Sequence, residues 1–245
     1  MNRLLMLLIS FLLTGITQAQ YVGIGTTTPA KILDVNGDAL INGLTIGMGS
    51  GNISTNTAIG NSVLSSNTTA LGNTAVGYES QKLTTTGIAN TSIGFMSMAN
   101  NSEGYYNVSL GAWTLNQNSN GYHNTAVGYG SLYSNNTGFE NTGLGYGAAM
   151  GAGNLQNATA IGAKAYAAAS NSLILGSVAG VNGAVNSVNV GIGTTTPTAN
   201  LDVEGSVRLA DGTQALGFVL TSDNNGVATW KPGANPALEG LLCNL

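Results

Sequence analysis

The residue types that most often carry enzymatic chemistry are scarce in this chain. Among 245 residues there is one histidine, His123, and one cysteine, Cys243. A histidine that acts as a general base needs a nucleophile and an orienting acid beside it, and a zinc site needs at least three protein ligands. The chain is repetitive, and in other copies of the repeat the position of His123 is filled by Gly72, Ala89, Tyr106 and Glu140. This variability predicts an exposed histidine without a catalytic role, and a single cysteine excludes an internal disulfide.

Carboxylates are equally sparse in the middle of the chain. Between residues 39 and 201 the only acids are Glu79, Glu103 and Glu140, and no two of them are close in the sequence. Polysaccharide-cleaving sites need two carboxylates that face each other across a groove. We therefore expect a protein that is not an enzyme and needs no cofactor or metal, and a cleaving tailspike is the weaker alternative.

Two short segments have the spacing of calcium-binding oxygens. Asp34, Asn36 and Asp38 are spaced like the start of a calcium loop, and Asp223 to Gly226 is a shorter version. A calcium loop also needs further oxygens and a distal glutamate, and neither segment offers one. We expect both segments to be turns that are capped by their own Asp and Asn side chains.

Aromatic and threonine residues recur at fixed positions and could form contact surfaces. Tyr78, Phe95, Tyr129 and Tyr146 share one position, and Trp113 lies near it. These five residues predict either an aromatic ladder that packs internally or between chains, or a contact surface for carbohydrate or protein. A threonine column (Thr57, Thr74, Thr91, Thr125, Thr142 and Thr159) could bind ice on a flat face, but a structural ladder explains one column better.

These residues must be positioned by a repeat with one short and constant period. A glycine returns once in every copy, and an asparagine stands four residues before most of these glycines. The pairs are Asn56 and Gly60, Asn73 and Gly77, Asn90 and Gly94, Asn107 and Gly111, Asn124 and Gly128, and Asn141 and Gly145, followed by Gly162 with Ala158. Seven units in register predict one small structural unit that is stacked along an axis.

The composition of each unit predicts a stack of β-strands. Before each glycine stand one small and one aliphatic residue, and a second apolar column lies half a period away, at Leu64, Met98, Leu115, Leu132 and Ala149. We interpret each unit as two short strands and two turns. Coils about 4.8 Å apart place like residues over like, which favours Asn and Thr ladders and excludes columns of charge. Charged residues are accordingly only 7% of the chain.

The flanks of the repeat differ from it in composition. Residues 1–19 predict a secretory signal peptide with cleavage between Ala19 and Gln20, and no later segment is long and apolar enough to span a membrane. The expected organisation is a signal peptide at 1–19, connector strands at 20–45, the β-roll at 46–180, a second connector at 181–205, a β-hairpin at 206–231 and an irregular tail at 232–245.

The repeat resembles the head domain of YadA-like trimeric autotransporter adhesins. The matching elements are Asn56-Thr-Ala-Ile-Gly60, Asn73-Thr-Ala-Val-Gly77 and Asn124-Thr-Ala-Val-Gly128. The near-identical segments 22–29 and 190–197, together with 218–223 and 227–230, resemble secreted bacterial proteins related to phage tail fibres. The resemblance implies left-handed parallel β-rolls that pack as a homotrimer. It implies neither the stalk nor the tether of that family, because this chain has no heptads.

The function expected from these observations is attachment. An adhesin-like head would be secreted, or held at the cell surface by a partner, and would present its repeated face to an extracellular protein or glycan. The alternative is a structural fibre or spacer of the phage-tail type, without a ligand of its own. Nucleic acid is an improbable partner, because the chain has six Lys and Arg residues against ten acids.

Overall fold

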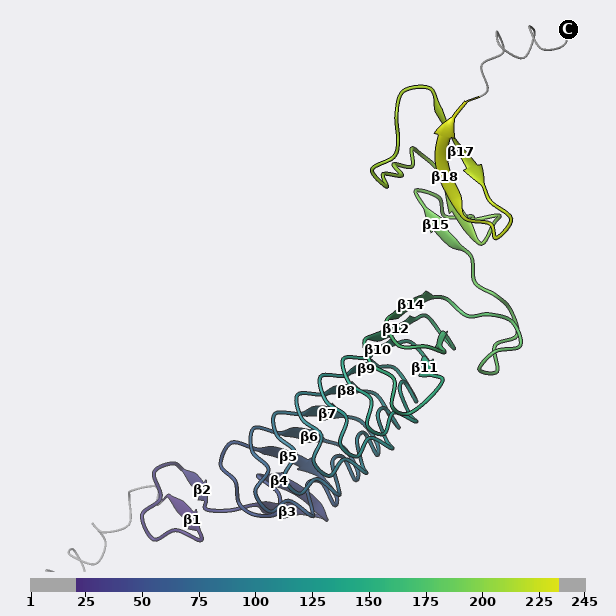
Figure 1. The fold of residues 1–245 in the computed structure, drawn as a ribbon. Coiled ribbons are helices and arrows are strands. Elements are labelled where there is room, and N and C mark those ends of the chain that lie inside the picture. Colours follow the sequence, from purple (N-terminus) through teal and green to yellow (C-terminus); the bar gives the residue numbers. More distant parts are fainter. Residues whose placement is uncertain (1–20, 234–245) are drawn as a thin grey trace, which may run out of the picture. The chain divides into compact units, whose positions relative to one another are not determined.

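The protein is an all-β chain whose main body is a β-solenoid of about seven coils with a repeat of about 17 residues, as the periodicity predicted (Figure 1). The computed structural model describes residues 21–233. The predicted cleavage site at Ala19 and Gln20 and the end of the predicted tail lie outside these residues. One ten-stranded sheet, in the order β14-β12-β10-β9-β8-β7-β6-β5-β4-β3, forms a side of the solenoid.

Each coil contributes one short strand to this sheet, and a hairpin of two further strands precedes the first coil. The strands are β3 (Ala39–Ile41), β4 (Leu44–Gly47), β5 (Thr57–Gly60), β6 (Thr74–Val76), β7 (Thr91–Ile93), β8 (Val108–Leu110), β9 (Thr125–Val127), β10 (Thr142–Leu144), β12 (Ala158–Ile161) and β14 (Ser172–Leu175). From β5 to β14 all neighbours pair in parallel. From β5 to β12 the register places each residue opposite its copy in the next coil, so that Thr57 pairs with Thr74 and Ala58 with Ala75.

Alternation along each strand separates an inner column from two outer columns. The inner column, which is fully buried, consists of Ala58, Ala75, Ser92, Ser109, Ala126, Gly143 and Ala160. The residues on either side of it point outward: the threonine column on one side and an outer aliphatic column on the other. The outer aliphatic column consists of Ile59, Val76, Ile93, Leu110, Val127, Leu144 and Ile161. Small inner residues are needed because the coil is too thin to hold two facing layers of large side chains.

Our prediction of a second strand in each coil is largely wrong. The side chains of Leu64, Met98, Leu115 and Leu132 are buried and pack toward the inner column, but their backbone has φ between 45° and 52°. That left-handed conformation is a turn and not an extended strand. Internal turn bonds such as Ser80 N to Gly77 O alternate with bonds to the next coil such as Met98 N to Thr114 O. Within the described coils, a second sheet forms between β11 (Ala149–Met150) and β13 (Tyr166–Ala167), and Phe139 and Gln156 add an isolated bridge.

The repeated glycine marks the point where adjacent coils approach most closely. A Cβ atom added to Gly94 would lie 2.4 Å from the carbonyl oxygen of Gly111, and Gly77 stands in the same relation to Gly94. The φ of Gly94 is also 143°, which L side chains rarely adopt. Both the contact and the dihedral angle therefore require glycine at this position.

The repeated asparagine forms a buried ladder along the stack, as the like-over-like arrangement predicted. Asn90 Oδ1 accepts hydrogen bonds from Asn107 N at 3.0 Å and from Asn107 Nδ2 at 3.0 Å. Asn90 Nδ2 donates in turn to Gly104 O at 2.8 Å. The same arrangement recurs at Asn107, and Asn124 keeps the bonds to Asn141 N and Gly138 O. Each side chain thus joins its own coil to the next one and satisfies backbone groups that the turns leave unpaired.

The two ends of the solenoid differ from its middle. At the start, β3 and β4 form an antiparallel hairpin, and β4 pairs antiparallel with β5. At the other end the last coil is shortened, because Ala158 of β12 pairs with Ser172 of β14. The chain then continues into a loop at residues 177–188, which folds back on the last coils.

The predicted connector segments form matching small units. β1 (Val22–Ile24) pairs in parallel with β2 (Leu33–Val35), and β15 (Val190–Ile192) pairs in the same register with β16 (Leu201–Val203). Among the described residues, 189–233 form a compact unit separate from residues 21–188. In this second unit β17 (Phe218–Ser222) and β18 (Ala228–Pro232) form the antiparallel hairpin that the sequence predicted.

Candidate functional site

The segment 223–226 is a turn capped by its own aspartate, as predicted, whereas Asp34 lies in strand β2 and Asp38 bonds the backbone ten residues further along the chain. Asp34 Oδ2 accepts a hydrogen bond from Ala30 N, and the Asp38 carboxylate accepts from Met48 N and Gly49 N. Asp223 Oδ1 accepts from Asn225 N and Val227 N. These carboxylates therefore satisfy backbone N–H groups. Within residues 21–233, no cluster of three or more His, Cys, Asp or Glu side chains is placed to hold a metal ion.

His123 lies on the surface among aromatic rings. It contacts Tyr105, Tyr106 and Tyr122, with ring centroids 5.2–5.7 Å apart. Tyr105, Tyr122 and Phe139, which occupy the same position in successive coils, stack nearly parallel with centroids 4.8 Å apart. This second aromatic group is a ladder at the spacing of the coils, and it is the internal packing arrangement that we expected for aromatic columns.

The five residues predicted as a contact surface are brought together in one run along the solenoid. Tyr78 stacks on Phe95 with centroids 5.2 Å apart, and Phe95 lies 5.7 Å from Trp113. Tyr129 and Tyr146 form a second stacked pair at 5.8 Å, and each residue is 55% exposed. Tyr133, which stands outside the repeated position, also reaches this run, and its ring lies 6.2 Å from that of Trp113.

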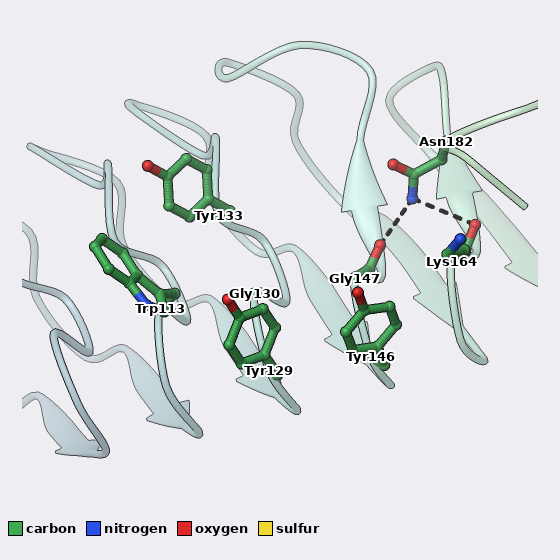
Figure 2. Close-up of a pocket in the computed structure, with 8 residues that line it drawn as sticks. All are labelled: Trp113, Tyr129, Gly130, Tyr133, Tyr146, Gly147, Lys164 and Asn182. Carbon is green, nitrogen blue, oxygen red and sulfur yellow. Dashed lines mark hydrogen bonds between the residues drawn. The ribbon is translucent and has the colours of Figure 1, made fainter.

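The second half of this run surrounds a hollow of about 440 Å³, which we call the aromatic cavity. Its walls are formed by Trp113, Tyr129, Tyr133, Tyr146, Lys164 and Asn182. Figure 2 shows the rings of Tyr129 and Tyr146 side by side on neighbouring coils, with Tyr133 opposite Tyr129. The volume lies within the range of about 300–1,000 Å³ that small-molecule sites occupy.

The aromatic cavity exists because one column of side chains is interrupted. In successive coils the column contains Ser62, Glu79, Met96, Trp113, Gly130, Gly147 and Lys164. All seven residues have φ between 53° and 62°. Since five of them carry side chains in this left-handed conformation, the backbone does not require glycine here. Gly130 and Gly147 leave a gap between Trp113 and Lys164, and a Cβ at Gly130 would meet nothing within 4 Å.

The loop that ends the solenoid closes one end of the cavity. Asn182 Nδ2 donates to Gly147 O at 2.7 Å and to Lys164 O at 3.3 Å (Figure 2). Lys164 Nζ donates to Gly183 O. The loop itself is held by bonds such as Ser177 Oγ to Asn186 O. Sequence reasoning missed Lys164 and Asn182, because the loop lies outside the repeat, although the paired glycines were visible as a break in the column.

At the Tyr78 end of the aromatic run, the two charged side chains pair with each other. Lys82 Nζ and Glu79 Oε1 form an ion pair at 2.8 Å. The hydrogen bond from Lys82 lowers the pKa of Glu79, and the same bond raises the pKa of Lys82. The side-chain hydrogen bond with Glu79 raises the pKa of Tyr78. Lys164, in contrast, is the only charged residue that lines the aromatic cavity.

A second surface feature is the outer aliphatic column on the sheet. Ile93, Leu110 and Leu144 are each at least 40% exposed, and they belong to strands of the same stack. Large apolar side chains that line up on one face are typical of surfaces that contact another molecule. Within residues 21–233, no helix is long and apolar enough to cross a membrane.

Comparison of the chain with protein-family models, with curated proteins and with solved structures found no match. Two exposed surfaces, the aromatic run and the outer aliphatic column, are the parts of the described structure that point to a function.

Proposed function

We propose that this protein is a secreted, non-catalytic adhesive head of the YadA-like type, which presents the aromatic run of its solenoid to an extracellular protein or glycan. The observation that supports this proposal most directly is the exposure of Tyr129 and Tyr146 beside a cavity of about 440 Å³. Packing does not explain them, because the ladder formed by Tyr105, Tyr122 and Phe139 buries its rings more fully. Exposed Tyr and Trp side chains supply contact area at a low cost in conformational entropy.

The proposal includes assembly as a homotrimer through the outer aliphatic column. In a single chain, this column leaves Ile93, Leu110 and Leu144 in solvent on a sheet face. Each thin coil buries mostly alanine, serine and asparagine, so a single chain gains little from its own core. Packing of three such faces around a common axis would cover the column and add apolar burial in every coil.

The adhesion experiment uses fluorescent beads that are coated with the purified protein. The beads are applied to bacterial cells and to matrix proteins, and albumin-coated beads serve as the background. We expect the protein to increase bead retention, and the variant Tyr129→Ala/Tyr146→Ala to reduce it. Retention that does not exceed the albumin background on any of these surfaces would refute the adhesive function.

A rigid spacer is the second candidate, and the regularity of the stack favours it. From β5 to β12 every strand pairs with its copy in one register, and the Asn ladder runs through the same coils. Such a stack sets a fixed distance between its two ends. If the protein is only a spacer, bead retention should equal the albumin background, while light scattering should still give the mass of a trimer.

A further inference from the structure

The aromatic cavity has the features of a binding site that is formed by the omission of side chains. Met96, Trp113 and Lys164 show that the left-handed position of this column accepts long side chains. In this column only Gly130 and Gly147 have no side chain, and both line the cavity. Glycine at a left-handed position avoids about 1 kcal/mol of backbone strain, but five of the seven copies carry a side chain there, so the coil does not require glycine in two successive copies.

The walls combine flat apolar faces with polar groups at their edges. Tyr129 and Tyr146 offer exposed rings on neighbouring coils, and Trp113 adds a third ring (Figure 2). Each tyrosine also carries a hydroxyl group, and Asn182 retains its carboxamide oxygen, since its hydrogen bonds to Gly147 and Lys164 use Nδ2 only. A sugar ring matches this combination, because its C–H faces stack on aromatic rings while its hydroxyl groups form hydrogen bonds at the edge.

The charge in the cavity narrows the class of sugar. Lys164 is the one charged residue in the lining, and its bonded partner in the structure is a backbone carbonyl, Gly183 O. An ammonium group has three donors, so two remain for a ligand. No acidic side chain lines the cavity to balance the positive charge of Lys164. A carboxylate on the ligand would balance this charge and accept a charge-assisted hydrogen bond from Lys164.

We infer that the aromatic cavity binds a hexuronate unit of an acidic polysaccharide, with the sugar ring on Tyr129 and Tyr146 and its carboxylate at Lys164. This inference rests on the proposed function, because it names the class of ligand for the same surface. It assigns Gly130 and Gly147 the role of leaving room for the ring, and it assigns the loop at 177–188 the role of holding Asn182 beside it.

Tryptophan fluorescence provides a direct test. The chain has two tryptophans, Trp113 in the cavity and Trp230 in the separate C-terminal unit. In the variant Trp230→Phe, emission reports only on the cavity. The probes are trisaccharides of galacturonate, mannuronate and glucuronate, each compared with the corresponding neutral hexose trisaccharide. We expect at least one uronate probe to change Trp113 emission with saturation, and its neutral counterpart to bind about tenfold more weakly.

Two substitutions in this background locate the ligand. Gly130→Met fills the gap with the side chain that the same column carries at Met96, and it should abolish the fluorescence titration. Ser62→Met is the matched control, because Ser62 lies in the same column at a φ of 56°, far along the chain from the cavity. Lys164→Gln should lower the affinity for the uronate to that for the neutral sugar and leave the affinity for the neutral sugar unchanged. Circular dichroism checks that each variant keeps its β-structure.

The outcomes separate this inference from the proposed function. If none of the three uronates binds, if Gly130→Met binds as well as Ser62→Met, or if a neutral sugar binds equally well, the inference is wrong. Bead retention that survives Gly130→Met would leave the adhesive function in place without this site. Saturable uronate binding by a protein whose beads are not retained would support the site and refute adhesion.

Discussion

Asn73 and Asn90, which are 17 residues apart, form a hydrogen bond from the backbone N–H of Asn90 to Oδ1 of Asn73 at 2.9 Å. Both residues are completely buried. This bond is one step of the ladder that joins successive coils, and the first prediction concerns the same ladder in the middle of the stack.

Asn107→Ala should lower the free energy of unfolding by about 3 kcal/mol. The substitution removes the acceptor for Asn124 N and the donor to Gly121 O, and each buried group left unpaired costs about 1–3 kcal/mol. Urea unfolding monitored by circular dichroism measures the change. Asn120→Ala is the control, since Asn120 is exposed and its side chain donates to Glu103 Oε2, and it should change the stability little. Equal effects of the two substitutions would contradict the structural role of the ladder.

Gln81→Met should stabilise the solenoid by about 1 kcal/mol. Gln81 is fully buried in the column that otherwise contains Leu64, Met98, Leu115 and Leu132. Its Oε1 atom has no hydrogen-bond partner, while Nε2 donates to Ser92 Oγ at 3.0 Å. Methionine removes the unpaired oxygen, and Ser92 Oγ keeps its bond to Ser80 Oγ. The converse variant Met98→Gln should destabilise the protein, and a loss of stability on Gln81→Met would show that the Nε2 bonds outweigh the unpaired oxygen.

Gly94→Ala and Gly130→Ala should differ strongly in their effect on stability. At Gly94 the new Cβ would lie 2.4 Å from Gly111 O, so adjacent coils must separate, and we expect a loss of about 3 kcal/mol or more. At Gly130 the Cβ meets open space and the left-handed backbone alone costs about 1 kcal/mol. Thermal unfolding of the two variants side by side measures the difference. Similar midpoints would show that close contact between coils is not what fixes the repeated glycine.

Leu110→Thr/Leu144→Thr should weaken self-association without unfolding the coils. Both leucines belong to the outer aliphatic column and are exposed in the single chain, and threonine fits a strand equally well. Multi-angle light scattering over a dilution series should show a trimer for the unaltered protein and a shift toward the monomer for the variant. Circular dichroism should be the same for both. A monomeric mass for the unaltered protein at every concentration would refute the trimer.

The ion pair between Glu79 and Lys82 should give a small plateau in the dependence of stability on pH. Because the pKa of Glu79 is lowered from 4.5, its contribution is present above that value and is lost as the pH falls through the lower folded pKa. Because the pKa of Lys82 is raised from 10.5, its contribution is present below that value and is lost at higher pH. The difference in unfolding temperature between the protein and Glu79→Gln should be constant in between. A difference that persists at pH 2 would contradict this assignment.

The period of the sequence was sufficient to predict the stack, because a parallel coil places every residue over its own copy. Asn73 and Gly77 were therefore correctly interpreted as parts of a ladder and a turn between stacked coils. The second half of the coil could not be predicted in the same way. An apolar column indicates that side chains are buried, but Leu115 is buried from a left-handed turn just as well as from a strand.

The candidate site was predicted in part for a similar reason. Tyr129 and Tyr146 were identified from their recurrence and Trp113 from its place near their column, but the hollow between them depends on side chains that are missing at Gly130 and Gly147. Its closed end depends on Asn182, whose loop has no counterpart in any other coil of the described chain. Periodicity cannot predict the position of a segment that does not repeat.

The hairpin of β3 and β4 has a consequence for aggregation. A stack of parallel strands in register has the geometry of an amyloid fibril, and its open edge could recruit further chains. Here the first parallel strand, β5, is covered by β4, which runs in the opposite direction. The antiparallel β4 thus interrupts the run of parallel strands, and the edge strand of this sheet beyond it, β3, has only three residues. The hairpin thus protects this end of the solenoid against fibril growth.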